Sequence, residues 1–145
     1  MILVDSMQIC LANIAMATKV YGDEISEDYV RHMILNSLRK YNKEHKEEYG
    51  EMVLCYDGSK NWRKSIYPEY KAHRRRIRSE SDTDWDLLFT WIYTIRDEIK
   101  NTFPYRVIHV AEAEADDIIA VLAREADPFE NHLIVSSDKD FIQLH

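Results

Sequence analysis

The hydrophobic positions of the chain gather in four short runs, separated by longer segments of mixed character. The runs are residues 1–5, 52–57, 106–110 and 132–138, and Val, Ile and Leu dominate them without strict alternation of apolar and polar positions. Such runs are typical of parallel strands that are covered on both faces. The pattern therefore predicts four buried strands.

Three of the segments between these runs have the spacing of helices. Residues 26–48, 82–103 and 114–126 each repeat apolar side chains every three to four positions. Asp82 and Asp84 suit the start of the second helix. Because strands alternate with helices, the chain is expected to form an α/β fold with a mostly parallel sheet flanked by helices.

Acidic residues follow the predicted strands at the points where the strands stop. In an open parallel sheet, ligands bind at the edge formed by the carboxyl ends of the strands. Asp5, Asp57 and Asp138 each end one of the runs, and residues 106–110 are followed by a cluster of acids in the segment AEAEADDII. We therefore expect one crevice to collect Asp5, Asp57, Glu112 or Glu114, Asp116, Asp117, Asp138 and Asp140.

This crowding of carboxylates predicts a metal site. Several ionised acids in one crevice repel each other, and some of their pKa values must rise unless a cation is present. Oxygen ligands without histidine or cysteine favour Mg²⁺ or Mn²⁺ over zinc, and Mg²⁺ commonly accepts phosphate oxygens. Each acid has a structural alternative when taken singly. Asp5 and Asp57 could each belong to a turn or cap a helix, Asp116 and Asp117 could be first-turn acids that suit the helix dipole, Asp138 and Asp140 could form a polar turn, and Glu112 could be solvated.

A basic segment (residues 60–86) follows the second strand. Its first part, residues 60–78, carries eight Lys or Arg against one acid, a local charge of +7 in a chain whose net charge is −7. Trp62, Tyr67 and Tyr70 lie among these cations. Cations for phosphates and rings for bases are the groups that grip a single nucleic-acid strand. The segment predicts nucleic-acid binding, and a solvated helix or mobile loop is the alternative.

The remaining composition narrows the class of protein. No run of 18 apolar residues is present, so no membrane partner is expected, and the N-terminus lacks the basic flank of a signal peptide. Cys10 and Cys55 have no metal-type spacing and suit buried thiols in a reducing cytosol. At 145 residues, one domain or part of one is expected.

Several short motifs lie along most of the chain. They are VD at 4–5, YDG at 56–58, EADD at 114–117 and SSDKDFIQL at 136–144, together with EYKAHR at 69–74. The sequence resembles the 5′-nuclease superfamily, which includes flap endonucleases and the 5′-exonuclease domains of bacterial DNA polymerases. Within it, the pattern is most similar to the ribonuclease H enzymes of T-even bacteriophages.

The resemblance implies a PIN-like core whose basic segment forms a helical arch. It implies two Mg²⁺ ions, replaceable by Mn²⁺, held directly or through water by Asp5, Asp57, Glu114, Asp116, Asp117, Asp138 and Asp140. It assigns catalysis to Lys71, Asp57, Asp116 and Asp138. The implied nucleic-acid contacts are Arg63, Tyr70, Lys71, Arg74 and Arg75, with Tyr70 stacking on a base.

The implied function is metal-dependent 5′–3′ exonuclease or flap endonuclease activity on 5′-flap DNA or RNA–DNA hybrids during replication. A single-stranded-DNA-binding protein or a sliding clamp would be further partners, in the cytoplasm of a bacterial or phage-infected cell. The superfamily continues with more sheet, a helix-turn-helix module and two more aspartates, whereas this chain stops at His145. Residues 1–145 are therefore expected to be an N-terminal nuclease core with impaired or partner-dependent activity.

Three other functions stay open from the sequence. A non-catalytic module would bind nucleic acid in a salt-dependent way without cutting it. A PIN-type ribonuclease would prefer single-stranded RNA, although a long basic insertion is not expected in so compact a domain. A phosphatase with an acidic site would leave the basic segment without a role.

Overall fold

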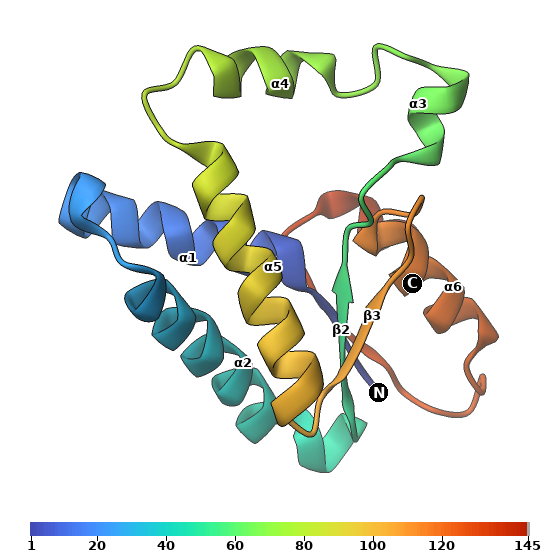
Figure 1. The fold of residues 1–145 in the computed structure, drawn as a ribbon. Helices are drawn as coiled ribbons and strands as arrows, with labels where there is room; N and C mark the ends of the chain where they lie inside the picture. Colours follow the sequence, from blue (N-terminus) through green and yellow to red (C-terminus); the bar gives the residue numbers. More distant parts are fainter. Residues whose placement is uncertain (145) are drawn as a thin grey trace.

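The computed structural model describes residues 1–144 and shows a four-stranded sheet between two layers of helices (Figure 1). The strands are β1 (Ile2–Asp5), β2 (Met52–Tyr56), β3 (Arg106–His109) and β4 (Leu133–Val135). Their order across the sheet is β3-β2-β1-β4, and every neighbouring pair is parallel. The predicted α/β fold and its four strands are confirmed.

The helices divide between the two faces of the sheet. One face is covered by α1 (Ser6–Tyr21), α2 (Glu27–Tyr49) and α5 (Trp85–Thr102), and the other by α6 (Ala115–Glu125). The 3-10 helices η1 (Gly22–Glu24) and η2 (Lys139–Leu144) complete the regular elements of these layers. Both cysteines are buried free thiols, as predicted.

Helix α1 was not predicted from the hydrophobic pattern. Its apolar side chains surround the helix instead of forming one stripe: Cys10 and Ile14 are buried, whereas Met16 and Val20 are 57% and 62% exposed. A helix without a distinct apolar face gives a weak periodic signal. The helix begins directly after β1, where the Asp5 side chain accepts a hydrogen bond from the Gln8 backbone N–H.

The prediction of four buried strands was wrong for the outer pair, although both outer strands pack side chains against the core on each face of the sheet. Strand β2 is buried throughout and β1 nearly so, whereas β3 and β4 are only partly buried. The outer strands have a neighbour on one side only. Strand β4 also ends before Ser136, because the Ser137 backbone N–H donates to the Gln8 side chain instead of continuing the sheet.

The basic segment crosses over the carboxyl-terminal edge of the sheet (Figure 1). It contains α3 (Trp62–Ile66) and α4 (Ala72–Ser79) and leads from the end of β2 to the start of α5. Lys71, just before α4, has a φ of 55°, which lies in the left-handed region that residues other than glycine rarely adopt. Among residues 1–144, no helix has the length and apolar character needed to cross a membrane.

Candidate metal centre and nucleic-acid interface

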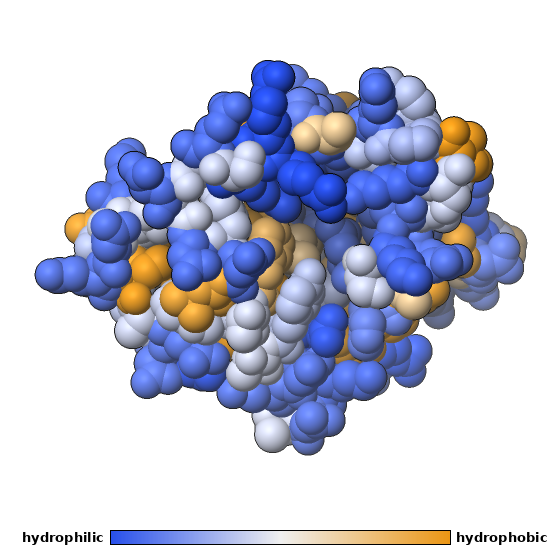
Figure 2. All heavy atoms as spheres, turned by 45° about the horizontal axis from the view of Figure 1, so that its top comes forward, coloured by the Kyte–Doolittle hydropathy of each residue, from blue (hydrophilic) through white to orange (hydrophobic). Residues whose placement is uncertain are grey.

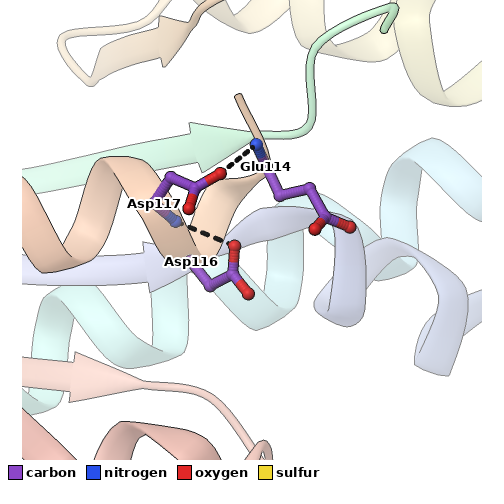
Figure 3. Close-up of side chains that lie close together, drawn as sticks. All are labelled: Glu114, Asp116 and Asp117. Atoms are coloured by element: carbon purple, nitrogen blue, oxygen red, sulfur yellow. Dashed lines mark hydrogen bonds between the residues drawn. The ribbon is translucent and has the colours of Figure 1, made fainter. Parts of the chain in front are cut away.

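Five of the predicted acids come together at the carboxyl-terminal edge of the sheet. Asp5 ends β1, and Asp57 follows the neighbouring strand β2. Glu114 caps α6, and Asp116 and Asp117 lie in its first turn. One carboxylate oxygen from each of these last three residues lies within 4.8 Å of the other two, close enough to share one ion (Figure 3).

A close approach of two loops places Asp57 against α6. The Gly58 N–H donates to the Ala113 carbonyl oxygen at 2.8 Å, and the Ala115 N–H donates to Asp57 Oδ1 at 2.8 Å. A Cβ atom on Gly58 would lie 1.9 Å from the Val110 carbonyl oxygen. Only glycine therefore permits this approach, which accounts for the glycine after the aspartate.

Three acids, which we call the unpaired acids (Asp5, Asp57 and Asp116), form no ion pair with the lysines and arginines of residues 1–144. Burial raises the pKa of each above its ordinary value. Neighbouring carboxylates raise these pKa values further: Asp57 and Asp116 act on Asp5, and Glu114 acts on Asp57 and Asp116. Lys71 and Arg74 lower the pKa of Asp57, and Arg63 lowers that of Asp116, but these cations act without direct contact and do not reverse the shift.

The other two, which we call the paired acids (Glu114 and Asp117), are held by cations of the basic segment. Glu114 accepts from Lys71 Nζ at 2.6 Å, from Arg63 at 3.0 Å and from the Tyr70 hydroxyl at 3.1 Å. Asp117 binds the Arg63 guanidinium through both oxygens, at 2.7 and 2.8 Å. Burial raises the pKa of each paired acid, but the hydrogen bonds outweigh burial and both pKa values fall.

The acids that follow β4 occupy a more open position. Asp138 and Asp140 are exposed, and the Asp140 N–H donates to Asp138 Oδ1. Sequence reasoning missed Ser136, whose hydroxyl lies 3.0 Å from Asp5 Oδ2 and accepts from the Asp138 N–H at 3.1 Å. The hydroxyl thus links this turn to the unpaired acids. Glu112 is exposed.

A cleft of about 1230 Å³ opens between the basic segment and the helical layer. Figure 2 shows the hollow with strongly hydrophilic side chains along one rim and apolar side chains inside it. Its cations are Lys60, Lys64, Lys71, Arg74, Arg75 and Arg78, and its lining also includes Asp57 and Glu114. Lys60, Lys64 and Arg78 were not among the predicted contacts, although the basic run of the sequence contains them.

An aromatic stripe on α5 also lines this cleft. Trp85, Phe89 and Tyr93 follow each other at one-turn spacing, with 6.3 Å between successive ring centroids. The Arg78 guanidinium lies 4.9 Å from the centre of the Phe89 ring. The cleft therefore offers cations for phosphates on one side and aromatic faces for bases on another.

Residues 1–145 match the family described as 5′-3′ exonuclease, N-terminal resolvase-like domain, and the protein belongs to that family. It is 40% identical to the ribonuclease H of Enterobacteria phage T4, across 99% of this chain and 48% of the relative. It is 34% identical to the flap endonuclease Xni of Shewanella denitrificans, across 84% of this chain and 45% of the relative. The chain thus spans about half the length of these relatives.

Solved structures confirm the fold. The T5 5′-exonuclease with bound divalent metal ions, there zinc, superposes with a TM-score of 0.74 at 17% identity, over 99% of this chain and 51% of the other. A T5 flap endonuclease complex with DNA and metal ions gives a TM-score of 0.73 at 18% identity, over 97% and 49%. The predicted family and the PIN-like α/β fold are confirmed.

Proposed function

We propose that the protein is a divalent-metal-dependent 5′ nuclease that hydrolyses phosphodiester bonds near the 5′ end of a nucleic-acid strand. One observation carries the proposal: partly buried acids without a cation partner lie beside a cleft with cationic and aromatic walls. The acids suit a metal, and the cleft suits a polyanion.

The unpaired acids fit a divalent cation. Burial and mutual repulsion disfavour their charge, and a bound cation would favour it. Because every donor is an oxygen, Mg²⁺ or Mn²⁺ fits better than zinc. We assign two ions to Asp5, Asp57 and Asp116, completed by Glu114, Asp138 and Asp140. When bound, such ions activate water and neutralise charge on the phosphate.

The cleft would hold and orient the strand. Lys71, Arg74 and Arg75 line the cleft and would contact phosphates near the acids, and the aromatic stripe would receive bases. Tyr70, which lies beside Lys71 but does not line the cleft, is a further candidate for stacking on a base. Burial lowers the pKa of Lys71, but its hydrogen bond to Glu114 outweighs burial and the pKa lies above its ordinary value. Lys71 therefore stays positively charged and can stabilise charge on the phosphate.

The substrates we propose are 5′-flap DNA and RNA–DNA hybrids. The names of the relatives, a ribonuclease H and a flap endonuclease, support both, and the T5 flap endonuclease structure contains DNA. In this proposal residues 1–145 form the N-terminal nuclease core, with the basic segment as its arch. A single-stranded-DNA-binding protein or a sliding clamp would be a further partner during replication.

The proposal is tested with a 5′-labelled flap and a labelled RNA–DNA hybrid in increasing Mg²⁺ or Mn²⁺. We expect metal-dependent release of short 5′ products. Asp57→Asn and Asp138→Asn should each slow cleavage about 100-fold or more, the effect of removing one well-placed electrostatic group. Glu112→Gln is the matched control, because Glu112 is an exposed acid near the same site.

Three results would contradict this assignment. Wild-type rates in both Asp57→Asn and Asp138→Asn would exclude the proposed metal centre. Salt-dependent binding without any metal-dependent cleavage would instead identify a binding module. A strong preference for single-stranded RNA over the flap would identify a PIN-type ribonuclease.

A further inference from the structure

Asp117 differs from its neighbour Asp116 in how its carboxylate is used. Asp117 Oδ1 accepts from Arg63, and Oδ2 accepts from Arg63 at 2.8 Å, from Trp62 Nε1 at 3.1 Å and from the Glu114 backbone N–H at 3.0 Å. Four donors therefore occupy this one carboxylate. Asp116 accepts a single backbone N–H, at 2.8 Å, and has no cation partner among residues 1–144.

We propose that Asp117 is not a metal ligand but a positioning residue that anchors the basic segment to the start of α6 through Arg63 and Trp62. This inference rests on the proposed function and refines its metal site. It also gives Arg63 a role other than the phosphate contact implied by family resemblance. Two adjacent aspartates of the EADD motif then have different tasks.

The geometry of a helix explains how neighbours can differ. Successive residues of an α-helix point about 100° apart, so Asp116 and Asp117 face different surroundings. The charge of Asp116 acts on Asp5 at the sheet edge, whereas Asp117 meets the start of α3. A divalent cation at Asp117 would have to displace a bidentate guanidinium, which is among the strongest side-chain hydrogen-bonding partners of a carboxylate.

Helix α3, which carries Arg63, needs a contact of this kind to hold its position. Helix α3 has five residues, too few for a helix that is stable by itself. Its first residue is tied to the loop between β3 and α6 by the Trp62 N–H, which donates to the Glu112 carbonyl oxygen at 2.9 Å. The Arg63 guanidinium also lies over two aromatic rings, 4.7 Å from Trp62 and 5.7 Å from Tyr70.

The anchor lies upstream of five of the six cations that line the cleft, all except Lys60. Tyr70 and Lys71, which end the stretch after α3, return to Glu114 in the same turn of α6. The short path from Arg63 to Lys71 is therefore fastened at both ends to the acid-bearing turn. Loss of the first attachment would leave the cationic wall free to move away from the metal centre, without removing a ligand.

Direct measurement of Mn²⁺ binding separates a ligand from an anchor. Free Mn²⁺ is titrated by electron paramagnetic resonance in the wild type, Asp116→Asn and Asp117→Asn. We expect Asp116→Asn to weaken binding at least about tenfold and Asp117→Asn to change it less than about threefold. If Asp117→Asn weakens binding as much as Asp116→Asn, the anchor is wrong while the nuclease proposal stands. If neither variant alters binding, the metal centre itself is wrong.

Limited trypsin digestion tests the anchor directly, because α4 contains four arginines. Arg63→Gln and Asp117→Ala should each accelerate cleavage within residues 72–79 about tenfold through easier local opening, and the double variant should add little. Asp116→Asn is the control and should digest like the wild type. If Arg63→Gln is digested at the wild-type rate, the inference is wrong. This variant keeps every residue of the acid-bearing turn, so its result does not depend on a change in that turn.

A kinetic readout on flap substrate distinguishes positioning from chemistry. Arg63→Gln should raise KM about tenfold with a smaller change in kcat, because the cleft loses its fixed wall but keeps its ligands. Arg63→Lys should recover only part of the loss, since lysine cannot form the bidentate pair. A fall in kcat alone would contradict the positioning role.

Discussion

The unpaired and paired acids lie at the same edge of the sheet and have opposite electrostatics. Burial acts on all five carboxylates and raises each pKa. Only Glu114 and Asp117 receive hydrogen bonds from lysine or arginine that reverse this effect. The two groups therefore differ in their cation partners: lysine and arginine side chains contact Glu114 and Asp117, and among residues 1–144 they form no ion pair with the other three acids.

This difference shows how one short motif can serve two purposes. The paired acids attach the basic segment to the core, and Arg63 and Lys71 of that segment neutralise their charges. The unpaired acids are left crowded and unmatched, which costs stability in the absence of a cation. Unsatisfied groups of this kind are typical of functional sites, where a ligand supplies the missing partner.

The largest expected contrast is in thermal stability with and without metal. Saturating Mg²⁺ should raise the melting temperature of the wild type by about 5 °C or more, because it binds the folded state. Asp57→Asn should melt higher than the wild type in EDTA, since it removes a buried repelling charge, and should lose most of the Mg²⁺ response. Scanning calorimetry in EDTA and in Mg²⁺ measures both effects.

Asp117→Asn provides the matched control for this experiment. It should melt lower than the wild type in EDTA, because it weakens the pair with Arg63, and should keep the Mg²⁺ response. The comparison between the two groups fails if Asp57→Asn and Asp117→Asn shift the melting temperature in the same direction in EDTA.

A smaller effect is expected when one paired acid is converted into an unpaired one. Lys71→Met removes the cation closest to Glu114, so Mn²⁺ affinity should rise about threefold. Cleavage should nevertheless slow about tenfold or more, because a positive charge beside the phosphate is lost. Titration and single-turnover rates measure the two quantities. Lys60→Met, another lysine of the cleft, is the control, and parallel changes in affinity and rate would contradict the assignment.

Much of the fold could be predicted from the pattern of hydrophobic residues. Helices α2, α5 and α6 each bury one side, so their stripes are visible in the sequence. Helix α1 escaped prediction because it exposes apolar residues such as Met16 and Val20 as well as burying Ile14. The exposure of β3 and β4 depends on strand order, which hydrophobic runs do not encode.

The sequence was sufficient to predict which acids form the candidate site, but not which of them pair with cations of the protein. Strand ends and the EADD motif identify the acids, and parallel strands bring them together. The separation of Asp117 from Asp116 depends on Arg63, which lies 54 residues earlier in the chain. The link through Ser136 likewise joins residues 131 positions apart. Such partners are set by tertiary packing, and short-range patterns do not contain them.

The smallest expected effect is a change in how stability depends on pH without metal. The paired acids have lowered pKa values, so their contribution is present above their ordinary values, 3.8 for Asp117 and 4.5 for Glu114, and is lost as the pH falls. The unpaired acids have raised pKa values, so their contribution is present at low pH and is lost as the pH rises.

These opposite signs predict that two variants will tilt the pH profile of stability in opposite directions. Asp116→Asn removes an acid with a raised pKa, so its urea midpoint in EDTA should increase with pH more than that of the wild type, from about pH 4 to 7. Arg63→Gln leaves the partly buried Asp117 without its cation, so the urea midpoint of this variant should decrease with pH relative to the wild type. Urea titrations at several pH values measure both slopes. Tilts of the same sign would show that the two groups of acids do not differ in the way their partners indicate.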